Sequence, residues 1–446
     1  MFPAGRGPTS LFDRLRDPQL YAAAAERVRA RQIDADRVRP LAAGGPYLQG
    51  FQDTAALAQR LARMVSRGEY RCEALVPRAA LIRGKQRTLY VASPLDEIVL
   101  GALAEALGET LEGHLSERVF SYRRGRSALG AVEQLLCYLR AHKRACPERR
   151  QQGLYVLRRD VRGYGEAIAS GPGSRLWPLV QDAAAASGEQ LEFLRAAFRP
   201  PVREASGSLV LPERGIPTGS PLQPAACNLY LTPVDRLLEA VPDGFYARYG
   251  DDMLFAHPDP ELVRDFARAL DSEIEALDLH WSADKCATLY WNAAGRRAPP
   301  RAAEFASAVA LEYLGFRVDF RGVIGLKREK SRSLLRDIAG RLERSARLLS
   351  GEAAEQRARD LCGVVNAALD PSHPAATLSA SALRHLVSDR AQLRDLDHKL
   401  ALLVARELSG RRGVRAFRAH PPRRLRAELG LVSLEHTRNS SGRTHG

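Results

Sequence analysis

Two adjacent aspartates, Asp251 and Asp252, stand between runs of aromatic and aliphatic residues in the stretch YARYGDDMLFAH, residues 246–257. The flanking runs predict two strands joined by a tight turn, so we expect both carboxylates in that turn. Neighbouring carboxylates repel each other, and a folded chain keeps such a pair in solvent or against a cation. A solvated hairpin turn is one interpretation, and a divalent-metal site is the other.

A third carboxylate ends another apolar strand. Asp160 follows LYVLRR in the run QGLYVLRRDV. If that strand lies beside the hairpin, Asp160 and Asp251 converge on one edge of a sheet. Two Mg²⁺ ions held there would lower the pKa of an attacking hydroxyl and stabilise a leaving pyrophosphate oxygen. The alternative for Asp160 is a cap of the helix that follows the strand.

The elements that must position these acids follow from hydrophobic periodicity. We expect paired strands within 74–94, a helix over 95–115, a helix up to about residue 144, a helical stretch over 174–198, a loop and helix over 215–241, a helix over 259–277, strands at 287–291 and 312–319, and mostly helical, basic chain from 327 onward.

The composition narrows the class of protein. The chain has 446 residues, 45% of them hydrophobic, which is enough for two or three domains or for one large lobed enzyme. The formal net charge of +15 indicates a nucleic-acid or anionic-surface partner. Basic side chains recur in IRGKQRTLY and FSYRRGRSA, which suit contacts with phosphates.

The cysteines and the hydropathy bear on the compartment. Six scattered cysteines show no C-x-x-C pair and no zinc spacing, which favours reduced, intracellular thiols. No run of 18 apolar residues occurs, so we expect neither secretion nor membrane insertion. The expected location is cytoplasmic.

The order of the motifs carries a family resemblance. GKQRTLYVASPLDEIVLGAL, SYRRGRSALGAV, RRDVRGYGEAI, GIPTGSPLQPAACNLYL, YGDD and YLGF follow one another over roughly residues 45–330. This order resembles the reverse transcriptase family, particularly bacterial enzymes of the group II intron and retron type. The resemblance implies an α+β right-hand polymerase fold with fingers, a ferredoxin-like palm and a helical thumb. The expected lobes are an N-terminal helical extension (1–45), fingers (46–145), palm (146–326, with a fingers segment at about 174–214) and a basic helical thumb region (327–446).

The resemblance also implies roles for individual residues. Asp160, Asp251 and Asp252, with Val161, would hold two Mg²⁺ ions, with Mn²⁺ as an alternative. The residues expected at the incoming nucleotide are Lys85, Arg87, Tyr164, Gly165, Thr218, Gly219 and Lys285, of which Arg87 contacts the triphosphate and Lys285 assists departure of pyrophosphate. The residues expected at nucleic acid are Arg123, Arg126, Leu314, Gly315, Arg332 and Arg336.

The sequence departs from the family pattern at the sugar. Gly165 stands where the family commonly has an aromatic residue that excludes the ribose 2′-hydroxyl, and Tyr164 precedes it. Either Tyr164 takes over this gate or sugar discrimination is weakened. Thr218 replaces the usual Gln, which puts the base and sugar contacts there in doubt as well.

Several functions remain open. The favoured interpretation is an RNA-directed DNA polymerase that copies a dedicated non-coding RNA in antiphage defence. The alternatives are a group II intron-like maturase, an RNA-dependent RNA polymerase and a catalytically idle RNA-binding scaffold. The expected partners are a structured RNA template, an RNA/DNA duplex and dNTPs, with no membrane; a homo-oligomer and an accessory defence protein are left open.

Overall fold

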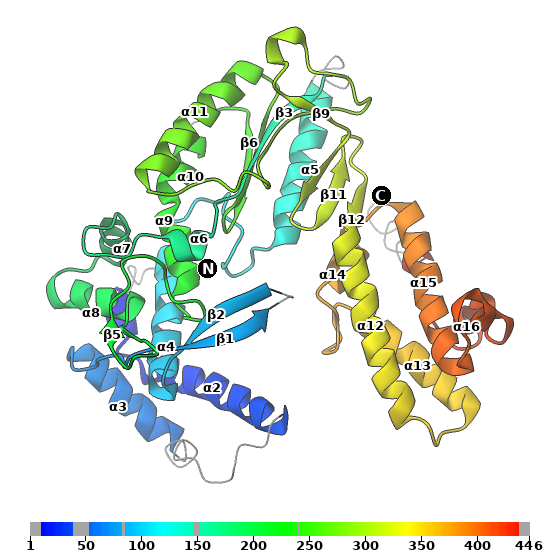
Figure 1. Cartoon of the computed structure of the whole chain (residues 1–446), viewed down its shortest axis with the longest axis horizontal. Coiled ribbons are helices and arrows are strands. Elements are labelled where there is room, and N and C mark those ends of the chain that lie inside the picture. Colours follow the sequence, from blue (N-terminus) through cyan, green and yellow to red (C-terminus); the bar gives the residue numbers. More distant parts are fainter. Residues whose placement is uncertain (1–9, 39–52, 83–84, 146–151, 240, 437–446) are drawn as a thin grey trace, which may run out of the picture. The chain divides into compact units, whose positions relative to one another are not determined.

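The computed structural model describes residues 10–38, 53–82, 85–145, 152–239 and 241–436. The chain divides into two compact units, coloured along the sequence in Figure 1. The first unit comprises Met1–Ser127 and Leu157–Ala287, and the second comprises Ala128–Val156 and Thr288–Gly446. Two of the three boundaries fall inside strands β3 (Leu154–Arg159) and β8 (Ala287–Trp291), and the third lies at the start of α5 (Ala128–Ala145).

The first unit combines helices with short strands. Its helices are α1 (Leu11–Arg14), α2 (Pro18–Val38), α3 (Thr54–Ser66), α4 (Pro94–Leu111), α6 (Tyr164–Ala167), α7 (Leu176–Ala184), α8 (Gly188–Phe198), α9 (Gln223–Tyr230), α10 (Thr232–Glu239) and α11 (Pro260–Ala276). Its strands are β1 (Val76–Ile82), β2 (Lys85–Val91), β4 (Val202–Arg203), β5 (Leu209–Val210), β6 (Phe245–Tyr249) and β7 (Asp252–His257), with the end of β3.

The strands that carry the acidic residues lie in the order β6-β7-β3. β6 and β7 are antiparallel, and Tyr249 pairs with Asp252 at the end of the hairpin. Both strands are almost wholly buried because their apolar side chains face protein on both sides. Gly250 and Asp251 therefore form the two-residue turn, where the positive φ of Gly250 (+67°) suits glycine.

Helix α11 lies along this sheet (Figure 1). It begins after Asp259, whose side chain accepts a hydrogen bond from the backbone N–H of Glu261. Its buried face repeats at helical spacing, and Phe266 packs against Phe255 of β7 with ring centroids 4.4 Å apart. The helix thereby covers the hairpin that holds the acidic turn.

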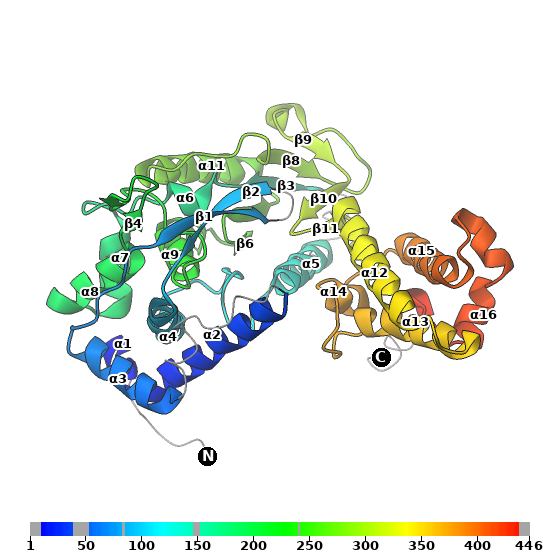
Figure 2. The ribbon, with the colours of Figure 1, turned by 60° about the horizontal axis from the view of Figure 1, so that its bottom comes forward.

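The second unit contains the C-terminal helices, best followed in Figure 2. Its elements are α5 (Ala128–Ala145), the start of β3, β8, η3 (Pro300–Ala302), β9 (Ala306–Ala308), β10 (Ala310–Tyr313), β11 (Phe316–Asp319), β12 (Ile324–Leu326), α12 (Arg328–Leu348), α13 (Ala354–Leu369), α14 (Ala380–His385), α15 (Arg390–Ser409), η4 (Gly413–Arg418) and α16 (Pro422–Ala427). β10, β11 and β12 form an antiparallel sheet. Helix α12 buries Leu334, Ile338 and Leu342, as its periodicity predicts.

The mixture of helices and mixed sheets confirms the predicted α+β class. The stretch predicted as helical over 174–198 is two helices, since Ala185 adopts a left-handed conformation (φ +48°) and ends α7. Residues 1–9 and 39–45 of the predicted N-terminal extension lie outside the described residues, and the four lobe boundaries stay predictions. Within the described parts of the chain, no helix is long and apolar enough to cross a membrane.

Candidate active site

The turn between β6 and β7 places Asp251 and Asp252 at the end of the hairpin. Asp251 lies in the turn itself, and Asp252 is the first residue of β7. Both residues are partly exposed although the strands around them are buried. The hairpin predicted from the sequence is confirmed, and its turn brings polar side chains to the edge of a buried sheet.

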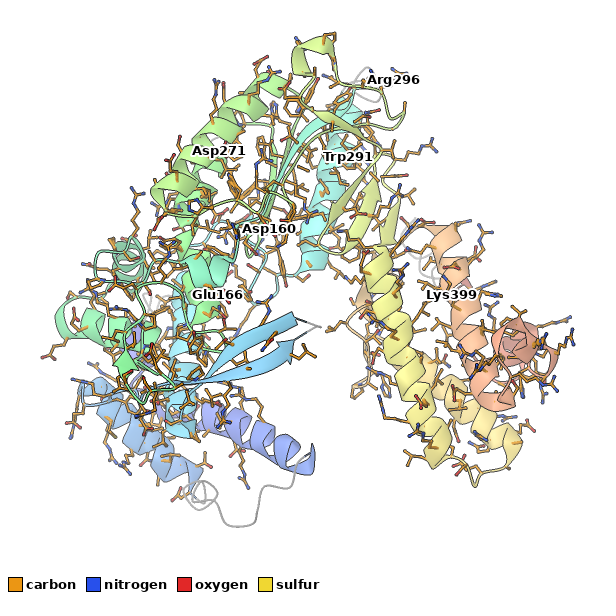
Figure 3. The ribbon with its side chains drawn as sticks, viewed as in Figure 1. Asp160, Glu166, Asp271, Trp291, Arg296 and Lys399 are labelled. Carbon is orange, nitrogen blue, oxygen red and sulfur yellow. The ribbon has the colours of Figure 1, made fainter. Side chains whose placement is uncertain are left out.

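Asp160 follows β3 directly and is labelled in Figure 3. It is 6% exposed, and its Oδ1 accepts a hydrogen bond from Lys285 Nζ at 2.7 Å. Its backbone carbonyl accepts from the N–H of Ser282 at 2.8 Å. The next helix, α6, has Gly163 rather than Asp160 at its N-cap, so the capping alternative is not what the structure contains.

Asp160 and Asp251 interact electrostatically. The pKa of Asp251 is raised to about 6, first by burial and then by the negative charge of Asp160. A cation bound beside Asp251 would offset this unfavourable charge.

Asp252 has a basic partner. Arg158, two residues before Asp160, contacts it with Nε and Nη2 at 3.3 Å and 3.2 Å from the two carboxylate oxygens. The ion pair is largely buried, with side-chain exposures of 22% and 17%. Asp252 is thus paired with an arginine.

The donor set partly fits a divalent metal. Across the described ranges, no three His, Cys, Asp or Glu side chains are grouped as metal ligands. The fit depends on Asp160 and Asp251, hard oxygen donors of the kind that Mg²⁺ and Mn²⁺ prefer. Val161, also predicted at the metal, is buried and bridges to Trp281 by its backbone.

Two residues predicted at the nucleotide, Thr218 and Gly165, accept backbone hydrogen bonds from other segments of the chain. The N–H of Tyr90 in β2 donates to the carbonyl of Thr218 at 2.9 Å, and the N–H of Ile216 donates to the carbonyl of Gly165 at 3.0 Å. A cavity of about 290 Å³ is lined by residues that include Tyr90, Glu166 and Thr218. Gly219 follows Thr218 and has a φ of +104°. A Cβ atom added at Gly219 would lie 3.6 Å from the carbonyl oxygen of Tyr90.

Gly165 lies against a side chain that the sequence does not point to. A Cβ atom added at Gly165 would approach Nε2 of Gln223 to 2.5 Å. The side chain of Tyr164 is turned into the protein interior, since it is 5% exposed and its hydroxyl donates to the carbonyl of Cys227 at 2.6 Å. Burial raises the pKa of Tyr164 further above its usual range. The hypothesis that Tyr164 replaces the missing aromatic residue is therefore not supported by its orientation.

The basic residues predicted at the triphosphate lie on different elements. Arg87 is exposed on β2, opposite Ala80. Lys85 begins the same strand, and nothing is described of its side chain. Lys285 contacts Asp160 and is half exposed, which leaves its ammonium within reach of solvent and of a bound anion.

The residues predicted at nucleic acid divide between the units. In the first unit, Arg123 has a side chain only 4% exposed, paired with Glu112 and bonded to the carbonyl of Val119, which makes it a structural residue. Arg126 is half-buried, and its Nη1 donates to the carbonyl of Glu117.

In the second unit, Leu314 and Gly315 form the turn between β10 and β11, with φ +48° and +83°. A Cβ atom at Gly315 would meet Cδ of Lys330 at 3.0 Å. Arg332 and Arg336 are exposed on α12, away from its buried face. This amphipathic placement agrees with the predicted basic helix.

Four residues of the site are not among those predicted from the sequence: Arg158, Arg248 and Ser121, which contact the acidic turn, and Gln223, which lies against Gly165. Arg248 left a signal, because an arginine within the otherwise apolar strand FYARY must either be solvated or find a buried partner. The other three carry no such local signal, since their partners come from distant segments.

Comparison with known proteins bears on the class. Residues 185–318 match the family model described as "Reverse transcriptase (RNA-dependent DNA polymerase)". The match includes the Asp251–Asp252 pair and begins after Asp160. A comparison with the curated proteins found no match.

Among solved structures, the chain is similar to apo telomerase from Candida tropicalis truncated from its C-terminal domain, with 10% identity and a TM-score of 0.44, over 59% of this chain and 58% of that one. It is also similar to telomerase from Candida albicans in complex with a fragment of telomeric RNA, with 12% identity and a TM-score of 0.48, over 83% of this chain and 64% of that one. The chain thus spans less than two thirds of these two structures.

The matched segment contains the acidic hairpin. Over residues 185–318 the chain is similar to a reverse transcriptase domain, and its helices and mixed sheets are consistent with the right-hand polymerase fold that the sequence predicts. Domains of this class are RNA-directed DNA polymerases and use divalent metal ions.

Proposed function

We propose that the chain is a reverse transcriptase that extends a primer on an RNA template by phosphoryl transfer assisted by two Mg²⁺ ions. The observation that supports this most is the juxtaposition of Asp160 and Asp251, where burial and the charge of Asp160 raise the pKa of Asp251. Metal ions bound there would activate the primer hydroxyl and stabilise charge on the departing pyrophosphate. Mn²⁺ could serve in place of Mg²⁺.

The protein's own residues position the reacting groups. In the reaction, the primer 3′-oxygen forms a bond to the α-phosphorus while the bond from phosphorus to the pyrophosphate oxygen breaks, and the hydroxyl proton is lost. Asp160 and Asp251 supply the negative charge for metal ligation, and Lys285 carries a positive charge beside Asp160 that can stabilise the leaving group. Arg87 on β2 is exposed for contact with the triphosphate.

Metal-dependent incorporation of dNTPs tests the enzymatic role. The wild type should extend a DNA primer on an RNA template when Mg²⁺ is added, and an Asp251→Ala/Asp252→Ala variant should not. Equal signals from the two proteins would instead support a catalytically idle RNA-binding scaffold.

Sugar selection is proposed to be weak. With Tyr164 turned into the core and no side chain at Gly165, the nearest group is the flexible amide of Gln223. A Gly165→Phe variant should incorporate ribonucleotides less than the wild type in competition with dNTPs. Equal incorporation by both would show that discrimination does not depend on this position.

The proposed biological role is antiphage defence, with a dedicated non-coding RNA as template. The support is the family resemblance and the basic helical region after β12, whose exposed Arg332 and Arg336 suit RNA phosphates. Sequencing the nucleic acid that copurifies with the protein would test this. A short structured RNA with complementary DNA supports the proposal, whereas intron RNA would support a maturase.

A further inference from the structure

The backbone of Gly250 is held from both sides by buried side chains. Its N–H donates to Oγ of Ser121 at 2.8 Å, and its carbonyl accepts from Nη1 of Arg248 at 3.1 Å. Ser121 and Arg248 are both 0% exposed. Because Gly250 directly precedes Asp251, these two bonds fix the peptide planes from which the Asp251 side chain projects.

Each hydrogen-bond donor of the Arg248 guanidinium has a partner. Its Nε and Nη2 bond to the two oxygens of Asp235 at 2.8 Å and 2.6 Å. Its remaining N–H groups bond to the side-chain and backbone oxygens of Asn228, at 3.3 Å and 3.2 Å, and to Gly250. All five donors of the guanidinium are thus engaged, which only an arginine can provide.

The partners of Arg248 are anchored on neighbouring helices. Asn228 belongs to α9 and Asp235 to α10. Asn228 also bonds to Ser121, since its Nδ2 donates to the Ser121 carbonyl at 2.9 Å and its Oδ1 accepts from Oγ at 3.1 Å. Ser121, Asn228, Asp235 and Arg248 therefore form one connected set, which we call the clamp.

Stability alone does not account for the clamp. Removing an ion pair from water costs free energy, and apolar side chains of similar volume are often at least as stabilising. Apolar replacements could not, however, donate to the Gly250 carbonyl or accept from its N–H. The feature specific to these residue types is the hold on the turn.

We propose that Ser121 and Arg248 are positioning residues that set the place of Asp251 relative to Asp160 through the backbone of Gly250. They touch neither substrate nor metal, and act through the turn alone. The inference rests on the proposed polymerase function for its kinetic readout, but the placement of Asp251 can also be measured without turnover.

The test compares two buried serines. Ser121→Ala removes the hydroxyl that holds the Gly250 N–H, and Ser170→Ala is the matched control, because Ser170 is also 0% exposed and its hydroxyl donates one bond, to the carbonyl of Pro212. Each full-length variant is assayed for primer extension on an RNA template, for the midpoint of urea unfolding, and for the shift in melting temperature caused by MnCl₂ alone.

Ser121→Ala should lower kcat by about tenfold, with KM for dNTP changed by less than about twofold, because misplacement of a reacting group costs rate rather than ground-state binding. It should also reduce the Mn²⁺-induced shift in melting temperature, and Ser121→Thr should restore part of both. Ser170→Ala should keep the wild-type kcat and Mn²⁺ shift at a similar urea midpoint. Arg248→Lys, which keeps the charge but loses the five-donor geometry, should resemble Ser121→Ala.

Wild-type kcat and Mn²⁺ shift in Ser121→Ala would overturn the proposal, as would equal losses in Ser170→Ala. If Arg248→Lys does not fold, the serine pair still decides. If the wild type makes no DNA, the proposed function fails, and the Mn²⁺ shifts of the two serine variants then test the positioning separately.

Discussion

Two groups of charged side chains flank the Gly250–Asp251 turn and differ in how their charges are satisfied. Beneath the turn, Arg248 and Asp235 neutralise each other at 0% and 2% side-chain exposure, with every guanidinium donor bonded. Above it, Asp160 and Asp251 repel each other, and the nearest cation, Lys285, is half exposed. The buried group is complete within the protein, whereas the charge of Asp251 in the acidic group stays unfavourable.

The buried group has a structural role, whereas the acidic group is the one proposed to take part in chemistry. Arg248 of the first group and Asp251 of the second lie on one strand and its turn. Burial lowers the pKa of Arg248, but the carboxylate of Asp235 more than offsets this, and the net pKa is raised. For Asp251, burial and the charge of Asp160 raise the pKa more than a backbone hydrogen bond and the charge of Lys285 lower it, so its net pKa rises. A rigid set of buried hydrogen bonds that holds an electrostatically unfavourable carboxylate is the arrangement expected of a preorganised site.

Breaking the buried pair should have the largest effect on stability. Arg248→Met leaves the Asp235 carboxylate buried without its partner, and should lower the free energy of unfolding by about 3–5 kcal/mol. Urea titration measures this. The control is Arg268→Met on α11, whose ion pair with Asp265 is exposed and should be worth less than about 1 kcal/mol. Similar losses in both would remove the contrast between the two groups.

Removing the charge of Asp251 should stabilise the metal-free protein. A carboxyl whose folded pKa is raised from 3.8 to about 6 destabilises the fold as pH rises through that interval, and the penalty is complete above it. In EDTA at pH 7.5, Asp251→Asn should therefore melt at a higher temperature than the wild type. Its free energy of unfolding should exceed that of the wild type by up to about 3 kcal/mol. The difference should vanish below the unfolded pKa. A variant less stable than the wild type at pH 7.5 would contradict this interpretation.

Loss of Lys285 should change stability least. Its ion pair with Asp160 is half exposed on the lysine side but only 8% exposed on the Asp160 side, so Lys285→Met should lower the free energy of unfolding by about 1–2 kcal/mol, less than Arg248→Met. If the lysine assists the leaving group, kcat should still fall by about 10- to 100-fold. Unchanged kcat at unchanged stability would show that Lys285 is only a surface partner of Asp160.

The acidic turn itself could be predicted from the sequence, because the apolar runs on either side of Gly250 and Asp251 predict two strands joined by a tight turn. Asp160 could be assigned to the same site only through the order of the motifs. The clamp could not, since its bonds join Ser121 to Asn228 and to Gly250, which lie 107 and 129 residues further along the chain. The inward orientation of Tyr164 depends on packing in the same way, and no local pattern fixes it.

The most direct test of the account is primer extension on an RNA template by Asp160→Asn beside Asp271→Asn. Asp271, labelled in Figure 3, lies on α11, where it accepts a hydrogen bond from Trp281 Nε1 at 2.8 Å, and it has no part in the proposed chemistry. Asp160→Asn should lower the rate by about a thousandfold or more, as expected for loss of a metal-binding catalytic group, while Asp271→Asn stays within about threefold of the wild type. Wild-type synthesis by Asp160→Asn would contradict the assignment of the active site.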